Sequence, residues 1–286
     1  MKIRLLPDEV INQIAAGEVV ERPASVVREL MDNSLDAGAT DLLIEIEQGG
    51  QQLVRVVDNG QGMAIDDAKL AFKRHATSKV SSAEDLLNIA TYGFRGEALS
   101  SISSVSRVIL KTRTEDSKVA YELDLVGGEV KREVNASGNV GTTIEVRDLF
   151  FNTPARKKFL KTPRGETARI KQLIIQSAIA RPEVRYRLVV DGEESLVIPR
   201  AKSPVERGLR QMSGAPIRVE FEDGEYAVHG AVAHPAMAAS DANSFVVLVN
   251  KRLVTDKVIL KAVREGFQST LKERDYPVGF ILLELP

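Results

Sequence analysis

The sequence predicts an α+β fold divided between two domains, one over residues 1–200 and a smaller one over residues 201–286. Helical patterns come first, and a run of four strand patterns follows between residues 108 and 147. Ala201-Lys202-Ser203-Pro204 is typical of a domain junction, and the pattern beyond it predicts the order β-β-β-α-β. The sequence stops directly after the last of these strands, so we expect the second domain to be incomplete at its C-terminal end.

The helices are predicted from their start and stop signals. Apolar residues at helical spacing follow Pro7-Asp8, and Pro23-Ala24-Ser25 begins a second helix that Gly38 ends. A glycine-bearing loop leads into another helix within residues 93–106. Further helices are expected near 65–72, 83–89, 154–160, 166–180 and 256–272.

The strands are predicted from short alternating or apolar runs. The first two, 42–47 and 52–57, are joined by Gly49-Gly50. The others in the first domain are expected over 108–112, 119–125, 129–134, 143–147, 184–190 and 194–198. In the second domain they are expected near 217–222, 226–232, 244–249 and 278–285.

Composition excludes several classes of protein. Of the 286 residues, 43% are hydrophobic and 28% are charged, which is typical of a globular protein. No apolar run approaches the ~20 residues of a membrane span, and the first residues do not form a signal peptide. There is no cysteine, so disulfides and thiolate metal sites are excluded. We expect a cytoplasmic protein, associated with the nucleoid if it is bacterial, and no membrane partner.

The motif Arg28–Thr40 places polar side chains on one helix face. Glu29 and Asn33 are four residues apart, and Asp36 continues their stripe. A carboxylate can deprotonate a water that attacks phosphorus, and a carboxamide oxygen suits Mg²⁺. The alternative is a solvated acidic helix face, because polar pairs at this spacing are common.

The motif Asp58-Asn59-Gly60-Gln61-Gly62-Met63 follows an apolar strand. The Asp58 carboxylate can accept a hydrogen bond from the exocyclic amine of adenine, and the two glycines allow the backbone to approach a ring closely. Together with the first motif, this predicts a purine nucleotide site that binds ATP and Mg²⁺. The alternative is an ordinary Asx or glycine turn.

Three weaker motifs could contact phosphates. Gly93–Leu99 is a glycine loop entering a helix, where backbone N–H groups attract anions. His75–Lys79 offers hydroxyls and a cation, and Gly141-Thr142-Thr143 opens a strand. The alternatives are a plain helix start and solvated polar residues. The sequence contains neither a P-loop motif nor a dinucleotide-binding glycine motif that opens a helix after a strand.

Taken in order, these motifs resemble those of the GHKL ATPases, the superfamily of gyrase B, Hsp90, histidine kinases and MutL. The resemblance is closest to the N-terminal half of the MutL family of DNA mismatch-repair proteins. Three stretches carry it, namely Asn12–Val27, Gly93–Leu99 and Phe151–Phe159. It covers essentially the whole chain and is strongest over residues 5–160.

The resemblance implies a Bergerat-type ATP-binding α/β sandwich of helices on a mixed sheet, followed by a partial transducer domain like domain 2 of ribosomal protein S5. It implies that Glu29 is the general base, Asn33 the Mg²⁺ ligand and Asp58 the partner of adenine. The implied nucleotide-contacting residues are Asn33, Asp36, Asp58, Gly62, Met63, Thr77, Ser78, Lys79, Gly93, Phe94, Arg95, Gly96, Glu97, Ala98, Leu99 and Thr143.

The resemblance also implies a weak ATP hydrolase that forms an ATP-dependent homodimer and acts as a nucleotide-gated DNA clamp. Its implied partners are DNA, bound without sequence preference in double- or single-stranded form, the mismatch-recognition protein MutS and downstream repair factors. The chain departs from the family pattern in having Asp32 where Glu is frequent. It also ends before the lysine that the family uses to reach the terminal phosphate, so hydrolysis is expected to be impaired. We expect no nuclease activity.

Two clusters of basic residues could bind DNA phosphates. Residues 151–172 carry seven positive side chains and only one acid, Glu166. In the second cluster, Lys257, Lys261 and Arg264 share one helical stripe, and the resemblance implies that Arg264 contacts DNA. The alternative is a solvated basic face.

Three other functions are compatible with parts of the sequence. A gyrase B-like type II topoisomerase ATPase is the main alternative, but stretches 12–27 and 151–159 favour the MutL family. A histidine kinase would need a phosphoacceptor histidine on a dimerisation helix, for which His75 is a poor candidate. A binding module that has lost its nucleotide conflicts with the presence of every nucleotide motif.

Overall fold

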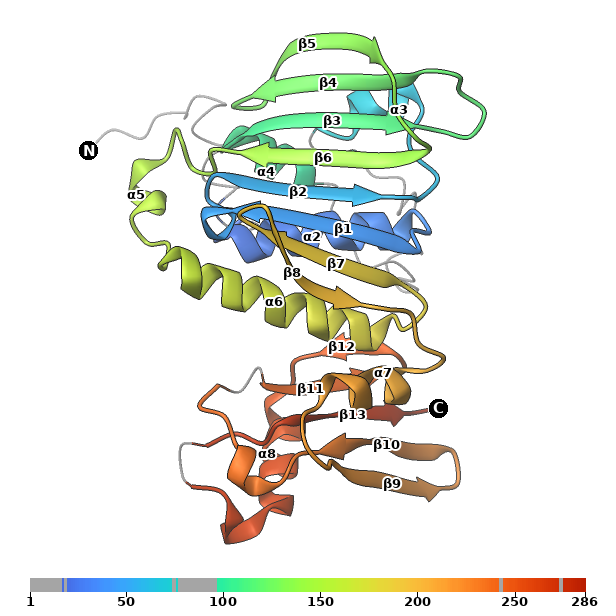
Figure 1. Cartoon of the computed structure of the whole chain (residues 1–286), viewed down its shortest axis with the longest axis vertical. Helices are drawn as coiled ribbons and strands as arrows, with labels where there is room; N and C mark the ends of the chain where they lie inside the picture. Colours follow the sequence, from blue (N-terminus) through green and yellow to red (C-terminus); the bar gives the residue numbers. More distant parts are fainter. Residues whose placement is uncertain (1–16, 18–19, 74–75, 77–96, 242–243, 273–274) are drawn as a thin grey trace, which may run out of the picture. The chain divides into compact units, whose positions relative to one another are not determined.

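The structure is a computed structural model that describes residues 17, 20–73, 76, 97–241, 244–272 and 275–286 (Figure 1). The chain forms two compact units. The first comprises the residues up to Lys171 together with Tyr186–Val197, and the second comprises Gln172–Arg185 with Ile198–Pro286. Each unit combines helices with a sheet of its own, so the predicted α+β class is confirmed.

The described part of the first unit is built on an eight-stranded sheet with the order β5-β4-β3-β6-β2-β1-β7-β8. Among β1 to β6, strands that are neighbours in this order pair antiparallel. Their bounds are Asp41–Glu47 (β1), Leu53–Asp58 (β2), Arg107–Arg113 (β3), Ala120–Val126 (β4), Glu129–Ala136 (β5), Gly141–Arg147 (β6), Arg185–Val190 (β7) and Glu193–Ile198 (β8).

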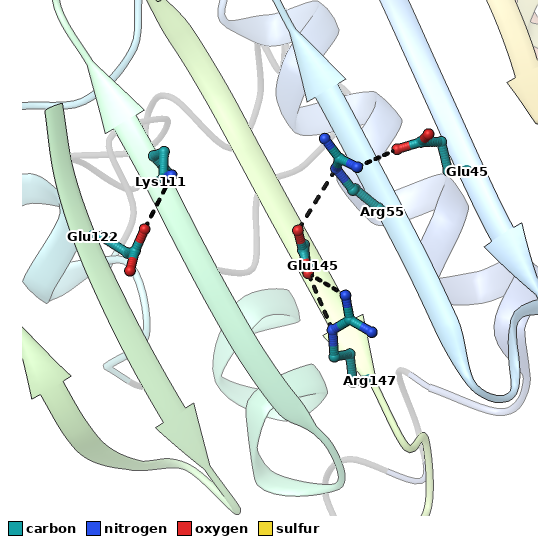
Figure 2. Close-up of polar contacts among 6 residues, drawn as sticks. All are labelled: Glu45, Arg55, Lys111, Glu122, Glu145 and Arg147. Atoms are coloured by element: carbon teal, nitrogen blue, oxygen red, sulfur yellow. Dashed lines mark hydrogen bonds and ion pairs between the residues drawn. The ribbon is translucent and has the colours of Figure 1, made fainter. Parts of the chain in front are cut away.

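The two faces of this sheet differ in chemistry because side chains alternate along each strand. One face is apolar, with Val54, Val56 and Ile144 buried beneath helices that Figure 1 shows behind the sheet. The other face is charged. Figure 2 shows its ion pairs, in which Arg55 lies 2.7 Å from Glu45 and 3.6 Å from Glu145. This face therefore neutralises much of its own charge.

The helices of the first unit are α2 (Pro23–Asp36), α3 (Ile65–Leu70), α4 (Ala98–Ser104), α5 (Pro154–Lys157) and the first part of α6 (Pro163–Ala180). Helix α2 positions the candidate site. Proline at its first position needs no hydrogen-bond acceptor for its nitrogen, and Gly38 leaves the helix at a φ of 76°. Leu30 and Met31 are almost fully buried and fasten α2 to the sheet.

The second unit contains, among its described residues, a five-stranded sheet with the order β12-β11-β13-β10-β9. The strand bounds are Ile217–Asp223 (β9), Tyr226–Val232 (β10), Phe245–Val249 (β11), Arg252–Val254 (β12) and Gly279–Glu284 (β13). The sheet is mixed, because β11 and β13 are parallel while the other neighbours are antiparallel. Helices α7 (Pro204–Gln211) and α8 (Lys257–Gly266) complete the unit.

Most predicted elements are found within a few residues of their expected bounds, and three differ. Helix α7 begins at Pro204, where we expected only a junction, because the Ser203 hydroxyl accepts from the Glu206 N–H and caps it. Strand β12 was also missed. The helix expected over 256–272 ends at Gly266, before Gln268 adopts a left-handed φ of 47°.

The helix expected after Pro7-Asp8 and the helix expected near 83–89 lie outside the described residues. Within the described ranges, no helix is both long enough and apolar enough to span a bilayer.

Candidate nucleotide site

The polar stripe of α2 forms one side of the candidate site. Glu29, Asn33 and Asp36 are all half-buried and recur on one face of the helix, as the spacing predicted. The neighbouring face, with Val27, is buried against the sheet. The stripe is therefore held in a fixed direction by the packing of the rest of the helix.

The Asp58 carboxylate lies at the end of β2, directly beside α2. Its Oδ2 atom accepts a hydrogen bond from the Ser34 hydroxyl at 2.8 Å. Its Oδ1 atom accepts from the backbone N–H of Gly60 at 2.9 Å and of Thr142 at 3.1 Å. The bond to Gly60 forms an Asx turn, so the ordinary turn expected as the alternative is present. The carboxylate is thus aimed by donors from α2, β6 and its own turn.

Burial and hydrogen bonding act in opposite directions on this carboxylate. Burial raises the pKa of Asp58 above its ordinary value of 3.8, and the bonds from Ser34, Gly60 and Thr142 each oppose that rise. The carboxyl is only half-buried, so it stays within reach of a ligand. It can offer a charged acceptor to an amine donor.

Glycines allow the backbone to pass close to this carboxylate. Gly62 adopts a φ of 71°, and a Cβ atom there would lie 2.1 Å from the carbonyl oxygen of Arg113. Gly141 adopts a φ of 120°, and a Cβ atom there would lie 2.2 Å from the carbonyl oxygen of Asp58. No side chain fits at either position without moving the backbone.

Hydroxyl groups connect this turn to the neighbouring strands. The Met63 N–H donates to Thr112 Oγ1 at 2.9 Å, and Thr112 Oγ1 lies 3.1 Å from Thr142 Oγ1. The register pairs Asp58 with Thr142, whereas Thr143 pairs with Val57 and lies on the opposite, charged face of the sheet. The structure therefore brings Thr142, and not the side chain of Thr143, to Asp58.

Asn59 fastens the same turn to the end of α2. Its Oδ1 atom accepts from the N–H groups of Thr40 and Asp41, both at 2.9 Å, and its Nδ2 donates to Thr40 Oγ1 at 3.0 Å. The Gln61 N–H donates to the Ala37 carbonyl at 3.0 Å. The two sequence motifs are thus joined at their adjacent ends.

Part of the predicted phosphate side lies outside the described residues, namely Thr77, Ser78, Lys79, Gly93, Phe94, Arg95 and Gly96. The three described residues of the glycine loop open α4. Glu97 precedes the helix and Ala98 and Leu99 form its first turn, where all three are half-buried. The Ser100 hydroxyl donates to the Glu97 carbonyl at 3.0 Å.

The stretch Phe151–Phe159 follows a turn with unusual backbone geometry. Asp148 and the buried Phe150 adopt φ values of 52° and 65°, which residues other than glycine seldom adopt. The Asn152 side chain then donates to the Ser104 carbonyl at the end of α4, at 2.8 Å. A Cβ atom at Gly17 would lie 2.1 Å from Arg156 Nη2, so this stretch also contacts the stretch at 12–27.

The predicted basic stripe lies on α8 in the second unit. Lys257 and Lys261 are exposed, and Lys261 lies 3.7 Å from Glu265. Arg264 is half-buried, and its guanidinium lies 5.2 Å from the centre of the Tyr276 ring. The three residues share one side of the helix, but Arg264 also packs within its unit.

Two residues around Asp58 were missed from the sequence: Ser34, which donates to Asp58, and Thr112, which contacts Met63 and Thr142. Ser34 is a buried serine inside a helix, and such a residue has no local capping role, which could have drawn attention to it. Thr112 is a buried threonine inside a strand. In the part of the chain that the structure describes, no group of three or more His, Asp or Glu side chains could hold a metal ion.

Two parts of the chain match known protein families. Residues 21–143 match the family described as histidine kinase-, DNA gyrase B- and HSP90-like ATPases. Residues 209–286 match the family described as the C-terminal domain of DNA mismatch repair protein. The first match contains Asp58 together with all of α2 from Pro23 onward.

The chain is similar over its whole length to curated relatives. It is 41% identical to the DNA mismatch repair protein MutL of Acidobacterium capsulatum over 314 residues, which cover 100% of this chain and 47% of that protein. The chain thus spans about half the length of the curated relatives that it matches.

Solved structures give the same family. The Aquifex aeolicus MutL ATPase domain complexed with ADP superposes with a TM-score of 0.70 at 30% identity, covering 94% of this chain and 93% of that one. The ATPase region of Saccharomyces cerevisiae topoisomerase II has a TM-score of 0.57 at 15% identity, covering 92% of this chain and 77% of that one. The second likeness shows a common fold alone.

Proposed function

Because the chain belongs to the MutL family of DNA mismatch-repair proteins, we propose that it is an ATP-binding and weakly ATP-hydrolysing module that acts as a nucleotide-gated clamp on DNA. One observation carries the proposal, the Asp58 carboxylate held beside the polar stripe of α2. The carboxylate would accept the amine of adenine, and the stripe would face the phosphates. The Aquifex aeolicus domain is described as complexed with ADP, which supports a nucleotide here.

Helix α2 contributes residues to both ends of the proposed site. Ser34 contacts Asp58 near the end of the helix, and Glu29 lies five residues earlier, about 7.5 Å along the axis. The base would bind at Asp58, and the phosphates would extend along the helix toward Glu29. Glu29 is then the general base, which accepts a proton from the water that attacks the terminal phosphate.

Asn33 would hold Mg²⁺ through its carboxamide oxygen. The described residues offer no complete protein cage for a metal, and Mg²⁺ is usually bound by one or two protein groups, waters and substrate phosphates. A single carboxamide oxygen, as Asn33 offers, fits that pattern. When bound, Mg²⁺ neutralises charge on the phosphate oxygens.

The remaining nucleotide contacts are proposed from the resemblance. We propose Asp36, Gly62, Met63 and Glu97–Leu99, and we add Thr142 because its N–H and hydroxyl both belong to the Asp58 cluster. Thr143 stays in the proposal only through its backbone. Thr77–Lys79 and Gly93–Gly96 are proposed from the sequence alone.

The test of this function is ATP binding and turnover by three proteins. Calorimetry with Mg-ATP should show binding by the wild type and by Glu29→Ala, whereas Asn33→Ala should lose Mg²⁺-dependent binding. Glu29→Ala should hydrolyse ATP at a rate lower by a factor of about 10² or more, because general-base catalysis contributes about that much. Asp67→Asn, an exposed carboxylate change on α3, is the control. Equal turnover by Glu29→Ala and the wild type would exclude Glu29 as the base.

We also propose that ATP drives dimerisation of two such modules, with the second unit acting as a transducer. Partners would be DNA, MutS and downstream repair factors, at the nucleoid within the cytoplasm. Size-exclusion chromatography with and without a non-hydrolysable ATP analogue tests dimerisation directly. An unchanged elution volume at saturating analogue would exclude it.

The basic stripe of α8 is the proposed DNA surface. Lys257→Glu with Lys261→Glu should weaken binding to all DNA sequences and reduce its dependence on salt, because phosphate contacts release counterions. These residues are exposed, so the double variant should fold normally. Arg264→Glu tests the third position, with Tyr276→Leu as control for the loss of the ring contact. Wild-type affinity in both Glu variants would leave the stripe as a solvated face.

A topoisomerase ATPase is the alternative. It rests on the fold alone, since the likeness to the yeast topoisomerase II region is at 15% identity.

A further inference from the structure

The acceptor capacity of Asp58 is almost fully used by described donors. An ionised carboxylate has about four lone-pair positions, two on each oxygen. The N–H groups of Gly60 and Thr142 occupy both positions on Oδ1. The Ser34 hydroxyl occupies one position on Oδ2. Among the described residues, one position on Oδ2 therefore remains for a ligand.

Ser34 determines which lone-pair position on Oδ2 remains for a ligand. Its side chain is 5% exposed and comes from α2, whereas the donors to Oδ1 come from the backbone of β6 and of the turn. The two backbone bonds hold Oδ1, and the Ser34 hydroxyl, from a different element, is the described donor that holds Oδ2. Together the three bonds define the plane of the carboxylate and so the direction of the remaining lone pair on Oδ2. The distance of 2.8 Å between Ser34 Oγ and Asp58 Oδ2 is that of an ordinary O–H···O hydrogen bond.

We propose that Ser34 is a positioning residue that fixes Asp58 Oδ2 so that its one remaining lone pair selects an exocyclic amine over a carbonyl group on the bound purine. The assignment rests on the proposed function, because it concerns the base of the same nucleotide. Adenine presents an amine at this position, and hypoxanthine presents a carbonyl oxygen. A fixed carboxylate lone pair attracts the first and repels the second. A carboxylate that can rotate discriminates less.

The buried site explains why a hydroxyl is needed there. Ser34 faces Asp58 from a helix whose neighbours on that side, Leu30 and Met31, are apolar and almost fully buried. An apolar side chain at 34 would leave Oδ2 beside apolar atoms without a donor, which is unfavourable for a carboxylate. Burial raises the pKa of Asp58, and the bond from the Ser34 hydroxyl opposes that rise.

The experiment compares the wild type with Ser34→Ala and with a matched control, Ser106→Ala. Ser106 is also buried, but its hydroxyl donates to the Ile102 carbonyl at 2.6 Å, away from Asp58. Calorimetry measures binding of Mg-ATP and of Mg-ITP, whose base is hypoxanthine. NMR of ¹³C-labelled aspartate carboxyls follows the titration of Asp58 without nucleotide, with Asp58→Asn for assignment.

Ser34→Ala should bind ATP about tenfold more weakly, the effect of losing one net hydrogen bond to a charged acceptor, and ITP within a factor of about two. The midpoint of the Asp58 titration should move to higher pH, and the pH below which ATP binding is lost should move with it. Asp32 and Asp36 are unchanged in this variant, so the movement reports the hydroxyl. Ser106→Ala should behave as the wild type in every measurement.

The proposal is overturned if Ser34→Ala keeps both the wild-type Asp58 titration and the wild-type preference for ATP over ITP. If Ser34→Ala does not fold, Ser34→Cys preserves the volume with a weaker donor and should change both measurements in the same directions. If the wild type binds neither nucleotide, the proposed function fails, and the carboxyl titration of the nucleotide-free protein still decides the role of Ser34.

Discussion

Replacing Gly141 by alanine tests whether the close approach of β6 to β2 is required at the candidate site. Gly141 adopts a φ of 120°, and the added Cβ atom would lie 2.2 Å from the Asp58 carbonyl oxygen and 3.1 Å from Asn59 Cα. Real Cβ atoms essentially never come within 3.0 Å of another heavy atom, and here the nearest neighbours belong to the backbone. The strands must therefore separate where Thr142 donates to Asp58.

The expected loss of stability has two parts. Holding alanine in a left-handed conformation costs about 1–3 kcal/mol. Separation of the strands weakens the bond from the Thr142 N–H to a charged acceptor, for which the cost is about 1.5–3 kcal/mol. We therefore expect the free energy of unfolding of the first unit to fall by about 2.5–6 kcal/mol. ATP affinity should fall more than tenfold, because the same movement displaces Asp58.

Gly192→Ala is the matched control for this prediction. Gly192 belongs to the same unit and has a φ of 87°, but no atom lies within 4 Å of the position of its Cβ. This variant carries the conformational strain without the steric contact, so it should lose only about 1 kcal/mol and keep its ATP affinity. Urea denaturation followed by circular dichroism measures both variants. Equal losses of stability in the two variants would refute the steric argument.

The remaining predictions concern pH, a buried arginine and a helix cap. Because the pKa of Asp58 is raised in the folded state, protonation of Asp58 stabilises that state at acid pH. This stabilisation is lost as the pH rises from 3.8 through the raised pKa. The difference in unfolding free energy between Asp58→Asn and the wild type should therefore change with pH over that window and be constant above it. Arg207→Ala should cost about 3–5 kcal/mol in urea denaturation, because it leaves a cavity and removes the buried donor to the carbonyl groups of Pro182 and Val184. Ser203→Ala should cost about 1 kcal/mol by the same measurement, since it removes the cap of α7, whereas Ser203→Asp should cost little.

The elements that the sequence predicted well are those with local signals. The sequence marks the start of helix α2 with Pro23 and its end with Gly38. In the structure Pro23 is the first helical residue and Gly38 has a positive φ. Asp58 was assigned correctly to the end of a strand because four of the five residues before it, Leu53–Val57, are apolar. Such features depend on a few neighbouring residues, so reading along the chain is sufficient.

The features that the sequence did not predict depend on contacts between distant segments. Ser34 and Asp58 are 24 residues apart, and only the packing of α2 on β2 joins them. The choice between Thr142 and Thr143 depends on the register of β6 against β2, because a shift of one residue reverses the faces. Helix α7 differs from these cases, because its signal is local. Ser203 and Glu206 form a capping motif, but Pro204 between them also indicates a domain junction, which is what we predicted.

Helix α2 sets the distance between the two ends of the proposed site. Ser34 and Glu29 are separated by five helical residues, so their spacing is set by helical rise rather than by flexible connections. Inserting or deleting one residue between them would turn one end by about 100° relative to the other, because a helix makes 3.6 residues per turn. This stretch should therefore tolerate changes of residue far better than changes of length.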